Sequence, residues 1–306
     1  MNFTPKRGQE HSAYLQLFMF FIFSCFGFII GIFLGFATCF GMYGFEVFRQ
    51  QEAFLRADTK FLDGLKVLQI LSTAGLFIIP PIFLSRFNGK KWTGLYGFKK
   101  PKLGLILVVL LIIICSMPIL EWITVLNQKM TLPGFLKNVE QWMREKENGA
   151  SEMTIAFLTV RNSWDFIINM FMIALLPAIG EELFFRGGLQ QLFTKLLYNH
   201  HLAIWLGAIV FSAIHLQFFG FFPRLFLGAA FGYIYYWSGS LWYSMLAHFL
   251  NNGYAVCVAL YMQKHHIPLD STEQTIDVKW YGYVASLLLS VAVFQYFKNK
   301  TTKSNG

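Results

Sequence analysis

The sequence predicts an all-α, polytopic membrane protein with about eight transmembrane helices in one bundle. Hydrophobic residues make up 56% of the 306-residue chain, which includes 35 phenylalanines, and charged residues make up only 13%. A soluble domain has roughly 25% charged residues, so a soluble core could not bury this much apolar surface. The apolar residues gather in stretches that approach the roughly 20 residues needed to cross a bilayer.

Eight apolar stretches are the predicted spans, and each is expected to form one membrane helix. They cover residues 14–40, 67–84, 103–123, 166–185, 202–222, 225–237, 241–262 and 281–297. Pro80, Pro81 and Pro177 break two of them, where neighbouring groups must satisfy the backbone carbonyls that a proline frees. We expect the first stretch to be retained as a span, because it is long for a signal peptide and lacks a small-residue cleavage pattern.

The basic residues between the spans predict the orientation of the chain. Those expected in the cytoplasm are Lys6, Arg7, Arg86, Lys90, Lys91, Lys99, Lys100, Lys102, Lys298, Lys300 and Lys303. The alternate loops, residues 49–66, 127–162 and 263–279, mix acids and bases. Both termini are therefore expected on the cytoplasmic side of a bacterial inner membrane, with membrane lipid around the chain. This topology explains the net charge of +9, and no basic face with aromatic platforms predicts a nucleic-acid partner.

For two further features we favour a structural role over a functional one. The cysteines Cys25, Cys39, Cys115 and Cys257 show no CxxC or Cys/His metal spacing, so we expect free thiols in or near the spans. The loop 127–162 is the longest, and it predicts a surface helix with Phe135, Leu136, Val139 and Trp142 on one side. We favour a solvated connector for this loop over a lid that faces the substrate.

Ionisable residues at membrane depth are the strongest functional signal in the sequence. Glu181 and Glu182 end the fourth stretch, and Arg186 follows one helical turn later. Glu182 and Arg186 are four residues apart, so they share a helix face and can form an ion pair. Glu181 lies about 100° round the helix, which leaves it free to face a cavity and to take part in proton transfer. A salt-bridge cluster at a helix end is the alternative.

Two histidines follow in separate apolar stretches. His215 alone is more often a packed, hydrogen-bonded residue than a catalyst, whereas His248 and Asn252 are four residues apart and can hold an oxyanion from one helix face. The predicted boundaries place Glu181 toward the cytoplasm and His215 beyond the midplane. The helices must therefore tilt, or the fourth span must start later, for the two side chains to meet.

These residues resemble the CPBP family of intramembrane proteases, which includes the CAAX prenyl endopeptidases of the Rce type and the bacterial Abi proteins. The family pattern is Glu-Glu-x-x-x-Arg, then Phe-x-x-x-His, then His-x-x-x-Asn or Asp. Here it occurs in order at 181–186, 211–215 and 248–252, and the resemblance covers about residues 166–254. It divides the chain into N-terminal helices (1–160), a protease-like core (161–262), and a loop, last helix and basic tail (263–306).

The resemblance implies an endopeptidase that acts on a membrane-associated protein or peptide. Glu181 and His215 would activate a water, His248 and Asn252 would stabilise the oxyanion, and Glu182 and Arg186 would support the site. No cofactor is favoured, although Glu181, His215 and His248 could ligate zinc in a metalloprotease. A proton-coupled transporter is the alternative from another class, but the chain lacks the internal repeats typical of transporters.

Overall fold

The computed structural model describes residues 11–269 and 278–302, so Lys6, Arg7 and Lys303 lie outside the described residues. All elements in this part of the chain are helices. They are α1 (Ala13–Tyr43), α2 (Glu46–Arg49), α3 (Gln51–Leu55), α4 (Leu62–Phe77), α5 (Ile79–Phe87), α6 (Trp92–Leu95), α7 (Leu103–Gln128), η1 (Gly134–Leu136), α8 (Lys137–Leu158), α9 (Ser163–Asn169), η2 (Met170–Leu175), α10 (Leu176–Glu182), η3 (Leu183–Gln190), α11 (Gln191–Leu197), α12 (His200–Ala213), η4 (Phe218–Gly220), α13 (Phe221–Ser238), α14 (Leu241–Lys264) and α15 (Trp280–Thr302).

The predicted all-α membrane fold is confirmed. Within the described residues, 6 helical segments are long and apolar enough to cross a membrane. Every one of the eight predicted stretches contains a helix, but α12 is only 14 residues long and α14 is not among the six. The protein is therefore an integral membrane protein, and eight is an approximate count of its spans.

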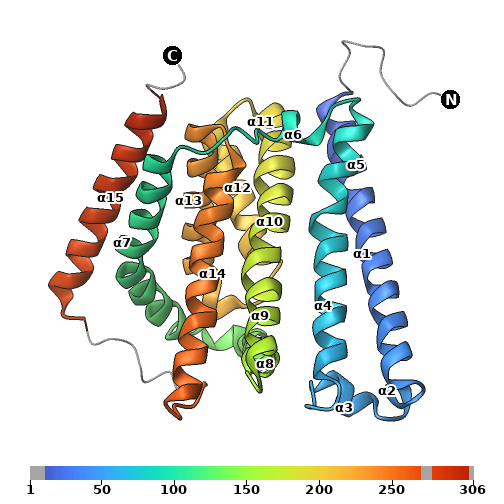
Figure 1. Ribbon diagram of the computed structural model, residues 1–306. Helices are drawn as coiled ribbons and strands as arrows, with labels where there is room; N and C mark the ends of the chain where they lie inside the picture. The colour runs from blue at the N-terminus through green and yellow to red at the C-terminus, as the bar shows by residue number, and fades with distance from the viewer. Residues whose placement is uncertain (1–10, 270–277, 303–306) are drawn as a thin grey trace.

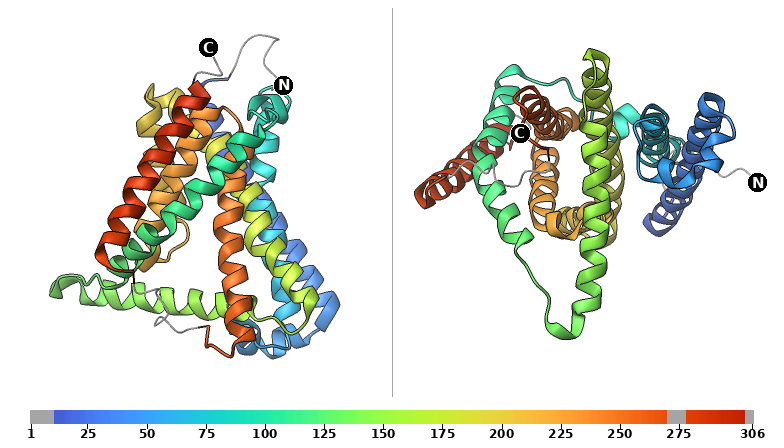
Figure 2. Two further views of the ribbon diagram at one scale, coloured as in Figure 1. Left: turned by 60° about the vertical axis from the view of Figure 1, so that its left-hand side comes forward. Right: turned by 90° about the horizontal axis from the view of Figure 1, so that it is seen from below.

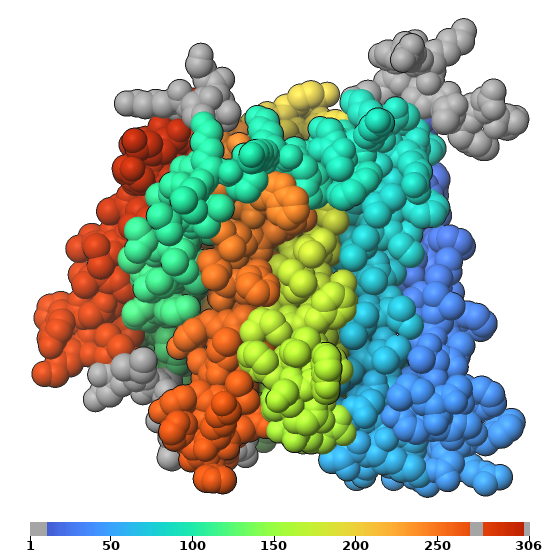
Figure 3. Space-filling view, in the orientation of Figure 1, coloured from blue at the N-terminus to red at the C-terminus, as the bar shows by residue number. Residues whose placement is uncertain are grey.

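The helices form an elongated row (Figure 1). α15 and α7 lie at one end, α1 and α4 lie at the other, and α10, α12, α13 and α14 form the middle. Figure 3 shows α14 and α10 side by side at the centre of one face, with α4 beside α10. The chain end of α15, the first turn of α1 and the basic loop before α7 all lie on one side of the bundle (Figure 1).

The fifth predicted span, 202–222, is wrong in its extent. The helix α12 ends at Ala213, and residues 214–217 form a turn before η4 and α13. Leu216 in this turn has a positive φ of 53°, which is uncommon for a residue with a side chain. The sixth span, predicted as 225–237, begins earlier as a result, at Phe221.

Prolines shape two of the membrane helices, and the break expected at Pro80 and Pro81 is present. α4 ends at Phe77 and α5 resumes with Pro80 and Pro81 in its first turn. In α7, Pro118 lies inside the helix, and Ser286 of α15 compensates for the opened backbone. The Ser286 hydroxyl donates to Cys115 O at 2.5 Å and accepts from Ile119 N at 3.2 Å.

The helices α1 and α4 pack closely and form one wall of the molecule. Gly27 and Gly75 let their backbones meet, because a Cβ atom at Gly27 would lie 2.2 Å from Gly75 O. This unit is attached to the middle helices at two levels. Near one end Phe20 packs on Gly188, and near the other Lys66, which is buried, pairs with Asp165 at 3.3 Å.

The helix α8 is the surface helix predicted in the loop 127–162. It crosses beneath the bundle on the side opposite the termini (Figure 2). Glu140 near its start accepts from Leu132 N at 2.8 Å and from Arg144 Nε at 2.9 Å. These donors lower the pKa of Glu140, so the anchor is present at neutral pH and weakens only as acid protonates this carboxylate.

Candidate active site

Glu182 is the centre of a buried polar cluster. Its side chain is fully buried at the end of α10, and its Oε1 atom accepts two hydrogen bonds. One comes from Arg186 Nη1 at 2.7 Å, and the other comes from His248 Nδ1 at 2.9 Å. The ion pair expected from the spacing of Glu182 and Arg186 is present, and it extends to a histidine on α14.

Arg186 connects this cluster to α13. Its Nη2 atom donates to Gly228 O at 2.9 Å, and its guanidinium carbon lies 4.9 Å from the ring centroid of Phe211 and 5.5 Å from that of Phe231. A buried guanidinium needs several acceptors and benefits from aromatic faces. Gly228 also packs against α12, because a Cβ atom added at Gly228 would lie 3.1 Å from Phe211.

His248 lies between the two glutamates. Its ring stacks on Phe231, with centroids 5.2 Å apart and planes 25° apart. Because an ionised carboxylate only accepts hydrogen bonds, the contact with Glu182 assigns a hydrogen to His248 Nδ1. The opposite ring atom, Nε2, lies 3.8 Å from Glu181 Oε2. Glu181 is 8% exposed, and it is the one of the two carboxylates that reaches a cavity.

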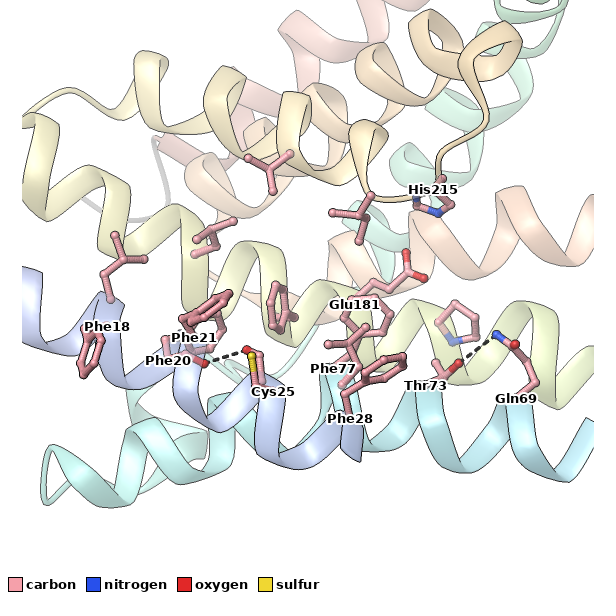
Figure 4. A pocket seen from close by; sticks show the side chains of 18 of the residues that line it. Phe18, Phe20, Phe21, Cys25, Phe28, Gln69, Thr73, Phe77, Glu181 and His215 are labelled. Carbon is pink, nitrogen blue, oxygen red and sulfur yellow. Dashed lines mark hydrogen bonds between the residues drawn. The ribbon is translucent and has the colours of Figure 1, made fainter. Parts of the chain in front are cut away.

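His215 lies in the turn after α12, and it faces Glu181 (Figure 4). Its Nδ1 atom donates to Phe211 O at 2.8 Å, which leaves Nε2 without a hydrogen in the neutral ring. The two side chains meet because the helical segment Ser163–Leu197 continues well past the predicted end of the fourth span. Glu181 is thus near the middle of that segment.

Two residues that the sequence analysis missed hold η4 and the start of α13, directly after the turn that carries His215. Asn127 at the end of α7 donates to Phe218 O at 3.2 Å and accepts from Phe222 N at 3.0 Å. Glu147 of α8 accepts from Phe219 N at 3.1 Å. No local sequence signal identifies either one, because both contacts depend on how distant segments pack.

Asn252 has a partner within the protein that the sequence analysis did not predict. Pro177 has no N–H, so it cannot donate to Ile173 O, which is four residues earlier. Asn252 Nδ2 donates to this oxygen at 3.1 Å. Its Oδ1 atom accepts from Asn251 Nδ2 at 3.1 Å. One hydrogen of the Asn252 amide is therefore used at the proline break, and the other has no partner among the described residues.

Two π-helical segments flank the glutamates, η2 before α10 and η3 after it. Such segments are rare and occur frequently at functional sites. These segments change which face of the helix each side chain occupies. A regular period of 3.6 residues therefore could not predict the faces.

A cavity of about 930 Å³ opens beside Glu181 and His215. Its wall is formed by α1, α4, α10 and the end of α12, and most of its lining is apolar (Figure 4). The aromatic lining residues include Phe18, Phe20, Phe21, Phe28, Phe77 and Phe184. An apolar cavity with a few convergent polar groups is the usual form of a ligand site.

The placement of the side chains gives no direct support to the alternative zinc site. In the described part of the chain no three His, Cys, Asp or Glu side chains lie close enough to hold a metal ion. The Nδ1 contacts of His215 and His248 are of the kind that orient metal-binding histidines. However, the two histidines and Glu181 do not converge on one point as three ligands.

The comparison with protein families matches this region. Residues 163–254 match the family described as type II CAAX prenyl endopeptidase Rce1-like. This segment is similar to that family, and we call it the Rce1-like region. It contains the two glutamates, Arg186, both histidines and Asn252, whereas Asn127, Glu147 and the α1–α4 wall lie outside it.

A curated relative covers part of the chain. The uncharacterized protein YpbD of Bacillus subtilis (strain 168) is 25% identical over 115 residues, which is 36% of this chain. The match spans 54% of the length of that relative. No solved structure matches the chain.

Proposed function

We propose that this protein is an intramembrane endopeptidase that hydrolyses a peptide bond of a membrane-associated protein or peptide. The observation that carries the proposal is the position of Glu181 and His215. They face each other on the wall of an apolar cavity (Figure 4), within an Rce1-like region. A carboxylate and a neutral imidazole nitrogen in this arrangement can bind one water between them.

In the proposed mechanism, Glu181 removes a proton from this water while His215 Nε2 orients it. The resulting hydroxide attacks the peptide carbonyl, and the carbonyl oxygen becomes an oxyanion. Glu181 then gives the proton to the leaving amine nitrogen, so it begins and ends the cycle ionised. A general base of this kind contributes roughly 10²–10⁴-fold to the rate.

The position of His248 supports it as an oxyanion donor. Its Nε2 atom lies 3.8 Å from Glu181 Oε2, on the side where the water would be activated. For this role both ring nitrogens of His248 carry a hydrogen, so that Nδ1 donates to Glu182 and Nε2 donates to the oxyanion. The free hydrogen of the Asn252 amide is the second proposed donor.

The substrate class follows from the cavity and the family description. The lining is apolar and suits a lipid-modified or hydrophobic segment, and CAAX prenyl substrates belong to the family described. The test is cleavage of a farnesylated CAAX peptide and of its unmodified form by the protein in proteoliposomes, with products identified by mass spectrometry. Glu181→Gln should abolish cleavage, and Glu121→Gln, an exposed glutamate of α7, should not. Equal cleavage by wild type and Glu181→Gln would overturn the proposal.

Metal dependence gives an independent test. The proposed mechanism uses a carboxylate to activate water, so exhaustive chelation should leave cleavage largely intact. A protein that loses activity in chelator, regains it with zinc and contains one zinc per chain would instead show His215 and His248 to be ligands. Proton flux through proteoliposomes without substrate would favour the transporter.

A further inference from the structure

Two polar side chains on α4 face the same cavity as Glu181 and His215. Gln69 and Thr73 lie one helical turn apart and are part of the cavity wall (Figure 4). Gln69 Nε2 donates to Thr73 Oγ1 at 3.1 Å. Both residues lie outside the Rce1-like region, which begins at residue 163, so the family match assigns them nothing.

An exposed glutamine in a membrane helix needs an explanation. The segment Leu62–Phe87 has a mean hydropathy of 2.0, and Gln69 is exposed within it, whereas Thr73 is buried. Amide groups without hydrogen-bond partners are costly in an apolar environment, and polar residues in membrane spans mark functional sites by default.

The bond to Thr73 leaves most of this polar capacity unused. Gln69 keeps its Oε1 atom and one N–H, and Thr73 keeps its hydroxyl hydrogen. Among the described residues, no donor reaches Gln69 Oε1. Another hydroxyl of the cavity, that of Ser24, is already used, because it donates to Phe20 O at 2.7 Å.

A peptide backbone is the ligand that matches these groups. A peptide held at membrane depth has no water for its N–H and C=O groups, so the protein must supply their partners. A side-chain amide presents an acceptor beside a donor, which is the complement of one peptide unit. The apolar groups around Gln69 and Thr73 leave few competing partners.

The position of the pair relates it to the scissile bond. Phe77 of α4 packs beside Gly180, whose Cβ would lie 3.1 Å from Phe77, and so it marks the level of Glu181. Gln69 is two turns before Phe77, roughly 12 Å along the helix. An extended peptide covers this distance in about three to four residues.

We infer that Gln69 and Thr73 bind the backbone of the substrate on the side of the cavity toward α8. Gln69 would contact it about three to four residues from the cleaved bond, and Thr73, one turn nearer to Phe77, about two residues from it. This inference rests on the proposed function, since it names a substrate-binding part of the same site. The pair acts as a specificity device: it requires an extended segment of a minimum length. It does not take part in the chemical step.

The test measures binding and turnover with Gln69→Leu and Thr73→Val. A matched control is Gln295→Leu, because Gln295 is an exposed glutamine of α15 whose Nε2 donates to Asn299 Oδ1 at 3.2 Å. The substrates are one cleaved peptide and two shortened forms, each lacking the outermost residues on one side of the bond. Gln69→Leu should raise KM about tenfold, as expected for one lost hydrogen bond, without lowering Tm. It should also remove the preference for the long peptide over one of the shortened forms.

Two outcomes separate this inference from the proposed function. If the wild type cleaves and Gln69→Leu keeps its KM and length preference, the inference is wrong and the peptidase stands. If the wild type cleaves no peptide, the Kd of the farnesylated CAAX peptide is measured for the wild type and for Gln69→Leu. An unchanged Kd in Gln69→Leu also refutes the inference, whereas a Kd about tenfold weaker supports it.

Discussion

At the scale of the residue, the site is organised by shared hydrogen bonds. Glu182 Oε1 accepts from both Arg186 and His248, while Glu181 is left facing the cavity. The sequence predicted the ion pair because two residues four apart on a helix are neighbours. It could not predict the contact of His248 with Glu182 or of Asn252 with Ile173, since these join separate helices.

Asn252 and Pro177 form a coupled pair whose relation can be measured. Asn252→Leu strands the Ile173 carbonyl, which should cost about 1–3 kcal/mol of unfolding free energy. Pro177→Ala restores the missing N–H, so the same Asn252→Leu change should cost less in that background. The measurement is a double-mutant cycle of thermal stability in detergent. Equal costs in the two backgrounds would show that Asn252 does not compensate for the proline.

At the scale of the element, the turn between α12 and α13 is the feature that hydropathy missed. Leu216, Phe218 and Phe219 are apolar, so the stretch 202–222 has the composition of one continuous span. The turn is held by tertiary contacts instead, from Asn127 of α7 and Glu147 of α8. The surface helix α8, which we expected as a connector, therefore contacts the segment that positions His215.

Removing the contact between α8 and this turn should affect turnover more than folding. Glu147→Leu loses the acceptor for Phe219 N, and misplacement of His215 should lower kcat by about 10- to 100-fold. Glu147→Gln keeps an acceptor and should recover most of the rate. Glu145→Leu on the exposed side of α8 is the control, because within the described part of the chain the Glu145 side chain accepts a hydrogen bond only from Gln141. A wild-type kcat in Glu147→Leu would show that this contact of α8 does not help to position His215.

At the scale of the whole molecule, the α1–α4 wall and the middle helices enclose the cavity between two attachment points. Phe20 packs on Gly188 at one attachment point, and the Lys66–Asp165 ion pair forms the other. Composition was sufficient to predict the membrane class, because only lipid can solvate so many apolar residues. The cavity was not predictable, since its walls come from helices more than one hundred residues apart.

The orientation of the molecule in the membrane remains a prediction with a direct test. Lys91 and Lys264 lie near opposite sides of the bundle, and both are exposed. In a variant without the four native cysteines, an impermeant thiol reagent added to intact cells should label Lys264→Cys but not Lys91→Cys. Permeabilised cells, in which both positions should react, provide the control. Labelling of Lys91→Cys alone would show that the orientation is opposite to the predicted one.

The central claim is that two adjacent glutamates have separate roles, Glu181 in chemistry and Glu182 in holding the site. Its most direct test measures peptide cleavage and thermal stability together for Glu181→Gln and Glu182→Gln. Glu181→Gln should abolish cleavage with Tm close to that of the wild type. Glu182→Gln weakens the acceptor of two buried donors, and breaking a buried ion pair costs about 3–5 kcal/mol, so its Tm should fall clearly. Cleavage retained by Glu181→Gln, or an unchanged Tm in Glu182→Gln, would contradict this division.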